Sequence, residues 1–116
     1  MIQYVVDTAI GLNGKEIIVV TGKNKDQIKK VLGNKIKYAV QEVPMGTGDA
    51  AKKGLVFATN PNLLILYGDV PLLTSETISK MIKNHFNQNA DLSVLTCEID
   101  YPDGYGRIVR NSNGKF

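Results

Sequence analysis

Apolar residues along the chain recur alternately at helical and at strand spacing. Spacings of three and four residues predict amphipathic helices, and short apolar or alternating runs predict strands. Clusters of Gly, Asn and Pro separate these runs and indicate turns. The predicted helices cover residues 2–10, 25–32, 49–58 and 75–86, and the predicted strands cover residues 16–20, 36–40, 63–67 and 92–99.

Polar residues mark the expected ends of these elements. Asn24, with Gln27 three residues later, is typical of a capping box at the start of the second helix. Thr74 or Ser75 is the predicted cap of the helix that follows it. After the last predicted strand, residues 106–109 are expected to be extended and residues 111–114 to form a hairpin turn.

The run at residues 63–67 is apolar at every position, which is typical of a central parallel strand covered on both faces. Alternating helices and strands along the chain favour an α/β fold. We expect a Rossmann-like, mostly parallel sheet with helices on both faces. The chain opens in a helix, and it ends at Lys115 and Phe116, where a hairpin is expected to return. We therefore expect an incomplete domain.

Composition limits the classes of function. The 116 residues suit one domain, and 43% hydrophobic with 22% charged residues excludes a disordered chain. The net charge of +3 is scattered, which disfavours a nucleic-acid partner. The single cysteine, Cys97, is expected to be a buried strand residue without a disulfide. Without a secretory signal or the ~20 apolar residues of a membrane span, we expect a cytoplasmic protein with no membrane partner.

The first candidate motif, residues 41–48, lies between a predicted strand and a predicted helix. Ligands of doubly wound sheets bind beyond the carboxyl ends of such strands. Its glycines allow a ligand to approach the backbone closely, and the Thr47 hydroxyl with the amides of the helix start suits a base edge or a phosphate. A tight turn without a ligand accounts for the same residues equally well.

The second candidate motif, residues 66–72, ends the apolar run with Tyr67-Gly68-Asp69. A single carboxylate at the tip of a buried strand suits Mg²⁺, which proteins hold by one or two carboxylates together with substrate phosphates. Gly68 leaves space for a ligand, and Pro71 directs the chain away. The alternative is that Asp69 only caps the following loop.

A third motif, residues 103–108, places Gly104 and Gly106 on either side of Tyr105, followed by Arg107, which suits a phosphate or a carboxylate. A β-turn with an exposed tyrosine is an equal alternative. The sequence holds no Ser/His/Asp set, no Cys/His metal cluster and no Walker A loop. His85, the only histidine, is expected on a helix surface rather than in a catalytic role.

Together the three motifs resemble the N-terminal uridyltransferase domain of bacterial bifunctional N-acetylglucosamine-1-phosphate uridyltransferase/glucosamine-1-phosphate acetyltransferases. The matching stretches are Gln41 with Gly-Thr-Gly-Asp-Ala at 46–50, Leu-Tyr-Gly-Asp-Val-Pro-Leu at 66–72, and Pro-Asp-Gly-Tyr-Gly-Arg-Ile-Val-Arg at 102–110. The resemblance covers essentially the whole chain. It implies transfer of UMP from UTP to N-acetylglucosamine 1-phosphate, giving UDP-N-acetylglucosamine for cell-wall precursors and pyrophosphate.

The resemblance also implies a role for each matching residue. Gln41 reads the uracil edge, and Gly46 with Thr47 lines the uracil pocket. Tyr67 and Gly68 lie beside the ribose and the sugar, and Asp69 is a ligand of the catalytic Mg²⁺. Gly106 contacts the sugar through its backbone. Two positions depart from the family pattern beside the base pocket, since Pro44 replaces a residue that is often polar and Asp49 replaces a residue that is often His.

Other parts of the family pattern have no counterpart among the 116 residues. These are the Gly-rich triphosphate loop with its strand, the later sugar contacts, the second Mg²⁺ ligand and the acetyltransferase domain. We therefore expect residues 1–116 to be a partial nucleotidyltransferase domain that is inactive by itself. A missing central strand would expose apolar surface, which favours self-association. Two alternatives stay open: another sugar-1-phosphate nucleotidyltransferase, or a non-catalytic nucleotide-binding or interaction module.

Overall fold

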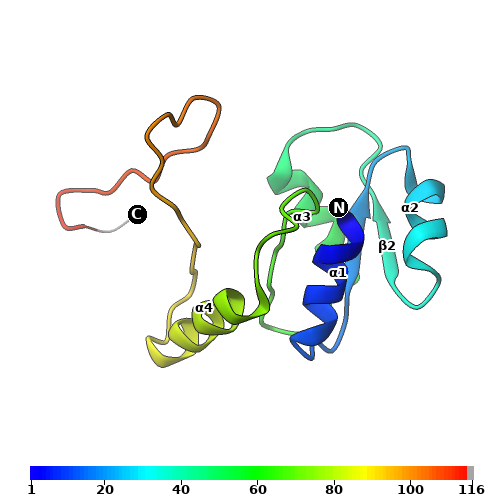
Figure 1. The fold of residues 1–116 in the computed structure, drawn as a ribbon, viewed down its shortest axis with the longest axis horizontal. Coiled ribbons are helices and arrows are strands. Elements are labelled where there is room, and N and C mark those ends of the chain that lie inside the picture. Colours follow the sequence, from blue (N-terminus) through cyan, green and yellow to red (C-terminus); the bar gives the residue numbers. More distant parts are fainter. Residues whose placement is uncertain (115–116) are drawn as a thin grey trace.

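The computed structural model describes residues 1–114, and Figure 1 shows the arrangement of its elements. The fold is α/β with parallel strands, as the sequence predicts. In chain order the elements are α1 (Ile2–Gly11), β1 (Ile18–Thr21), α2 (Lys25–Leu32), β2 (Lys37–Val40), α3 (Thr47–Leu55) and α4 (Ser75–Asn87).

The two strands form one parallel ladder, in which Ile18 lies opposite Lys37 and Thr21 opposite Val40. One further bond extends the ladder past the strand ends, because the Gln41 amide donates to the Thr21 carbonyl over 2.8 Å. The helix α2 connects the two strands, as a crossover between parallel neighbours requires. Both strands therefore end at the same edge of the sheet.

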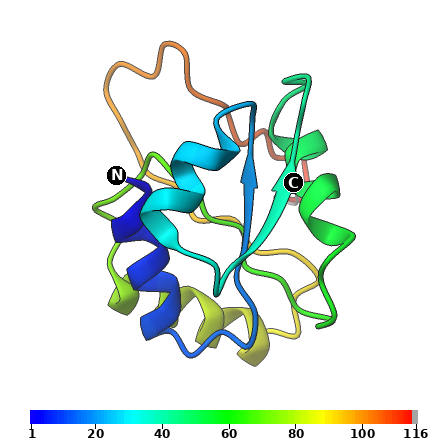
Figure 2. The same cartoon turned by 90° about the vertical axis from the view of Figure 1, so that its right-hand side faces the viewer.

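Helices cover both faces of the ladder, as Figure 2 shows with α1 and α2 on one side and α3 on the other. Gly54 of α3 is buried against β1, and a Cβ atom there would lie 3.1 Å from Cγ2 of Val20. The packing of α3 on the strand thus depends on a small residue at this position. The buried apolar side chains of the described residues come from α1, the two strands and α4: Val5, Val6, Val19, Ala39 and Ile78.

The predicted central strand at residues 63–67 is wrong in the described structure. These residues are extended but belong to no sheet, and Leu63 and Ile65 keep 50% and 66% of their surface exposed. A strand needs a hydrogen-bonded neighbour, and an apolar pattern reports the tendency to be buried rather than the presence of that neighbour. The edge of β1 with which residues 63–67 would have to pair lies on the opposite side of a groove.

That groove has a volume of about 710 Å³ and separates β1 from residues 63–67. Apolar side chains of α1 and α3 also line it. The carbonyls of Ile17 and Thr21 accept bonds from the β2 side, and alternate residues of a parallel ladder face the same neighbour. The peptide groups of Ile18 and Val20 therefore face the groove, where no strand of the described chain pairs with them.

The predicted strand at residues 92–99 is also wrong. After α4 the chain leaves the sheet as an arm, residues 88–114, which Figure 1 shows apart from the body of the molecule. Leu92 and Val94 are exposed, and Cys97 is exposed rather than buried in a strand. The arm raises the radius of gyration to 15.4 Å, whereas a compact domain of this length has about 13 Å.

Most of the predicted helix starts and turns are confirmed, but some of the predicted capping hydrogen bonds differ. The Thr74 hydroxyl accepts from the Thr77 amide over 3.2 Å and caps α4. Asn24 precedes α2 as predicted, but its side chain makes no cap bond, so the capping box is wrong. At residues 111–114 a turn forms through the Gly114 amide and the Asn111 carbonyl, without flanking strands. Lys115 and Phe116, where a returning strand was expected, lie outside the described residues.

A polar clamp at Glu16 holds the start of β1 to its surroundings. Its carboxylate accepts from Lys37 Nζ over 2.9 Å, from the Thr59 amide over 2.9 Å and from the Thr59 hydroxyl over 3.0 Å. These donors, led by the Thr59 amide and then Lys37, lower the pKa of Glu16 from 4.5 to about 2. One carboxylate therefore joins β1, β2 and the chain after α3.

We expect Glu16→Gln to lower the free energy of unfolding at neutral pH, because the neutral amide cannot satisfy the same donors. The wild-type carboxylate stabilises the fold fully above pH 4.5, and this contribution is lost as the pH falls towards about 2. The variant should lose less stability over that interval. Urea unfolding at a series of pH values measures both effects.

Glu76→Gln is the matched control, since Glu76 makes only an exposed pair with Lys80 at 2.9 Å. Identical dependence of unfolding on pH for Glu16→Gln and wild type would contradict the clamp.

Candidate nucleotide-binding site

The first two motifs lie at the carboxyl end of the strands. At that edge the Gln41 amide donates to the Thr21 carbonyl across the ladder. A Cβ atom on Gly68 would lie 2.7 Å from Cδ1 of Ile2, in the first turn of α1. The helix α1 runs opposite to β1, as Figure 2 shows, so its first turn lies at the end where β1 finishes. Thr47, Tyr67 and Gly68 all line the groove there.

The loop after β2 is closed by the Gln41 side chain. Nε2 of Gln41 donates to the Gly46 carbonyl over 3.0 Å and to Oδ2 of Asp49 over 2.8 Å. The backbone of Gln41 is meanwhile held by the Thr21 carbonyl. A single residue thus connects β1, the loop and the first turn of α3, so Gln41 is fixed rather than mobile.

Gly46 occupies a backbone conformation that requires glycine. Its φ of 92° and ψ of 173° belong to a region that other residues essentially never adopt. This conformation turns the chain into α3 at Thr47 and leaves the first amides of the helix without helical partners. Such amides, at the positive end of the helix dipole, favour an anion or a carbonyl oxygen.

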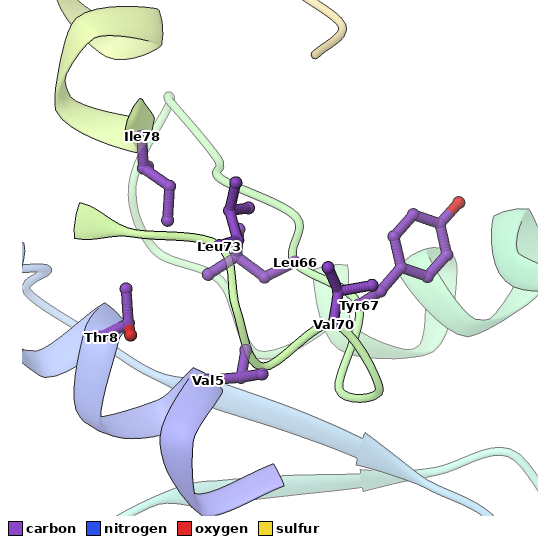
Figure 3. A pocket seen from close by; sticks show the side chains of 7 residues that line it. All are labelled: Val5, Thr8, Leu66, Tyr67, Val70, Leu73 and Ile78. Carbon is purple, nitrogen blue, oxygen red and sulfur yellow. The ribbon is translucent and has the colours of Figure 1, made fainter. Parts of the chain in front are cut away.

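The second loop turns at Gly68 and Asp69, where the Val70 amide donates to the Tyr67 carbonyl over 3.3 Å. Figure 3 shows how apolar contacts hold this loop, with Leu66, Leu73 and Val5 turned toward one another beneath α4. Only about 10 Å³ stays open between them, which is at most the space that one water molecule needs. Tyr67 points its ring away from this cluster and is 58% exposed.

Asp69 is exposed on that turn, and no hydrogen bond or ion pair engages its carboxylate within the described chain. Residues 1–114 contain no group of three or more acidic, His or Cys side chains that could hold a metal ion. The donor set is therefore one carboxylate, which fits Mg²⁺ only where substrate phosphates supply further oxygens. This arrangement agrees with a cation that arrives with a nucleotide.

The structure does not bring the third motif to this site. Gly106 lies on the arm, where the Tyr105 amide donates to the Pro102 carbonyl over 3.0 Å to form a turn. Arg107 is bound within the same loop, since its Nη1 donates to the Pro102 carbonyl over 2.7 Å and also to the Tyr105 carbonyl. In Figure 1 this loop is separated from α3 and from the carboxyl end of the strands.

The bond between Gln41 and Asp49 is the one feature of the site that sequence reasoning missed. The two residues are eight positions apart across a loop, where hydrophobic periodicity carries no information. The signal was the departure at position 49, where Asp replaces the more usual His. A carboxylate accepts from a glutamine amide wherever the loop allows the approach.

The fold and the two loops define the class of the protein as an α/β domain with a glycine-bearing loop and an exposed carboxylate near the carboxyl end of its parallel strands. Comparison with known families then gives the particular family. Residues 1–106 match the MobA-like NTP transferase domain, and the chain belongs to that family of nucleotidyltransferases.

Individual relatives agree with this assignment. The chain is 43% identical to the bifunctional protein GlmU of Pseudothermotoga lettingae over an alignment 117 positions long, which covers 100% of this chain and 26% of the relative. It is 40% identical to GlmU of Caldanaerobacter subterraneus over 115 residues and 37% identical to GlmU of Bacillus subtilis over 116 residues, each covering 98% of this chain and 25% of the relative. These relatives confirm the resemblance that the three motifs indicated.

The chain therefore spans about a quarter of the length of the curated relatives it matches. Among residues 1–114, no helix is long and apolar enough to cross a membrane.

Alanine substitution of the two glycines that flank Thr47 is expected to change the free energy of unfolding in opposite directions. Gly46→Ala should lower the free energy of unfolding by about 1–3 kcal/mol, because of its backbone conformation. Gly48 lies in helical α3, and a Cβ atom added to it would meet no atom within 4 Å, so Gly48→Ala should raise stability by about 0.5–1 kcal/mol. Urea unfolding of both variants measures the difference, and equal effects would contradict the assigned conformation of Gly46.

Proposed function

We propose that the chain forms part of an enzyme that transfers UMP from UTP to N-acetylglucosamine 1-phosphate in the cytoplasm. A phosphate oxygen of the sugar phosphate attacks the α-phosphorus of UTP. The bond between the α-phosphorus and the bridging oxygen breaks, and pyrophosphate leaves as UDP-N-acetylglucosamine forms. The observation that carries the proposal is that Thr47 of the first loop and Tyr67 and Gly68 of the second loop line the same groove.

Within this proposal each loop has a separate task. Gln41, Gly46 and Thr47 hold the uracil, because their polar groups lie on a loop that the Gln41 side chain fixes. Tyr67 and Gly68 flank the ribose and the sugar, and the lack of a Cβ atom at Gly68 lets this loop pack closely against Ile2 of α1. Positioning and charge neutralisation are the main contributions that an enzyme makes to phosphoryl transfer, so no side-chain nucleophile is required.

Mg²⁺ is the cofactor of the proposal, held by Asp69 and the nucleotide phosphates. When bound, the ion supplies a positive charge that polarises the α-phosphate. Asp69 is suited to this task because it lies on a turn whose position is fixed by the packing of Leu66 and Leu73 beneath α4. Gly106 would contact the sugar, which requires the arm to approach the turn at residues 68–69.

Asp69→Asn should reduce the part of UTP binding that depends on Mg²⁺. Wild type is expected to bind UTP more tightly in Mg²⁺ than in EDTA, and loss of the carboxylate ligand should diminish this difference by about tenfold or more. Isothermal titration calorimetry in both buffers measures it.

Asp91→Asn serves as the control, because Asp91 is an exposed carboxylate just after α4 and the variant has the same change in charge. An unchanged Mg²⁺ effect in Asp69→Asn, or an equal loss in both variants, would count against Asp69 as the ligand.

We also propose that the chain self-associates through its groove. The unpaired edge of β1 and the exposed apolar run at residues 63–67 face each other across the groove. A second copy of the chain placed there would pair with the strand edge and bury the apolar run. Exposed apolar surface of this kind and an unpaired strand edge both favour association with a second copy.

Sedimentation velocity over a range of concentrations tests the self-association. The weight-average mass of wild type should rise with concentration, and Ile65→Lys should suppress the rise by placing a charge in the groove wall. Leu72→Lys should behave as wild type, since Leu72 is 90% exposed but lies outside the groove. A monomer at every concentration, or equal suppression by both variants, would refute the proposal.

A further inference from the structure

The side chain of Gln41 has only one orientation compatible with its neighbours. Its two partners are the Gly46 carbonyl at 3.0 Å and the Asp49 carboxylate at 2.8 Å, and both groups only accept hydrogen bonds. The carboxamide nitrogen must therefore face them, because a flipped amide would replace two hydrogen bonds by two contacts between acceptors. Both amide protons of Gln41 are used in this arrangement.

The orientation leaves the Gln41 carbonyl oxygen as the group available to a ligand. Within the described chain, no hydrogen bond reaches that oxygen. Gln41 thus offers an acceptor alone, although a free glutamine side chain offers a donor or an acceptor as the ligand demands. Asp49 is the side chain that imposes this choice, together with the Gly46 carbonyl.

Asp49 is itself well placed to act on Gln41. It is half-buried and lies in the first turn of α3, where the helix dipole favours a carboxylate. The rigid helix therefore sets the position of the carboxylate, and the carboxylate sets the position of the amide. Glu42, the acidic residue that precedes Asp49 along the chain, is exposed and makes no such bond among the described residues.

We infer that Asp49 is a positioning residue that selects uracil over cytosine by holding the Gln41 carbonyl toward the base. This inference rests on the proposed function, in which Gln41 reads the base edge. At ring position 3, uracil carries an N–H donor and cytosine carries an acceptor. An oxygen held there bonds to uracil and meets the lone pair of cytosine, which leaves two acceptors facing each other.

The test compares dissociation constants for UTP and CTP, both with Mg²⁺, in wild type and in Asp49→Asn. Asparagine has nearly the same shape, but its amide can donate to the Gln41 oxygen, which removes one of the two acceptors that oppose the flipped orientation. Wild type should prefer UTP. In the variant the dissociation constant for CTP divided by that for UTP should be about tenfold lower than in wild type. Glu42→Gln, with the same change of charge beside the same loop, should keep the wild-type ratio.

A second measurement observes the Gln41 amide directly in the free protein. In wild type the two Nε2 protons of Gln41 should exchange slowly with water in ¹⁵N spectra, and in Asp49→Asn they should exchange faster. A purely structural role of Asp49 would weaken both nucleotides equally and leave their ratio unchanged.

The outcomes separate this inference from the proposed function. If wild type binds UTP and CTP equally, or if Asp49→Asn keeps the wild-type ratio, the inference is overturned while the proposed function stands. If wild type binds neither nucleotide, the proposed function fails, and the role of Gln41 and Asp49 in base selection falls with it.

Discussion

Parallel pairing of β1 with β2 is the constraint on which the other features depend. The register that sets Thr21 opposite Val40 also brings the Gln41 amide onto the Thr21 carbonyl. That bond fixes where the loop to α3 begins, and the loop in turn fixes Gly46 and the first turn of α3. The Glu16 clamp secures the other end of the same ladder by joining it to Lys37 and Thr59. A shift of one residue in this register would move every one of these groups.

The sequence predicted local elements well and long-range pairing poorly. The helices and both paired strands follow from spacing and caps, because these are set by residues close in the chain. Residues 63–67 read as a central strand since every side chain is apolar, yet they line an open groove across from β1. Leu92 and Val94 likewise alternate as in a strand but lie exposed on the arm. Apolar spacing indicates which side chains of a segment tend to be buried. Whether a neighbouring strand is present to pair with that segment depends on the tertiary structure.

The site shows the same division. The expected position at a strand end singled out Asp69 and Gly46, but residues 63–67 form no strand, and the groove is lined by Thr47 from one loop and by Tyr67 and Gly68 from the other. Gly106 was grouped with them through the family resemblance, and the structure keeps it apart on the arm. The bond from Gln41 to Asp49 does not follow from residue spacing, because it depends on the path of a loop rather than on a repeating pattern. Family membership adds the nucleotidyltransferase class, and the substrates remain a proposal for a chain that spans a quarter of its relatives.

Chemical-shift mapping of nucleotide binding tests the central claim most directly. Titration of UTP with Mg²⁺ into ¹⁵N-labelled protein should move the backbone amide signals of residues 41–49 and 67–70 together, with one dissociation constant for both loops. The amides on the outer face of α4 should stay in place. Shifts confined to one loop, or spread over α4 without a common dissociation constant, would contradict a nucleotide site built from both loops.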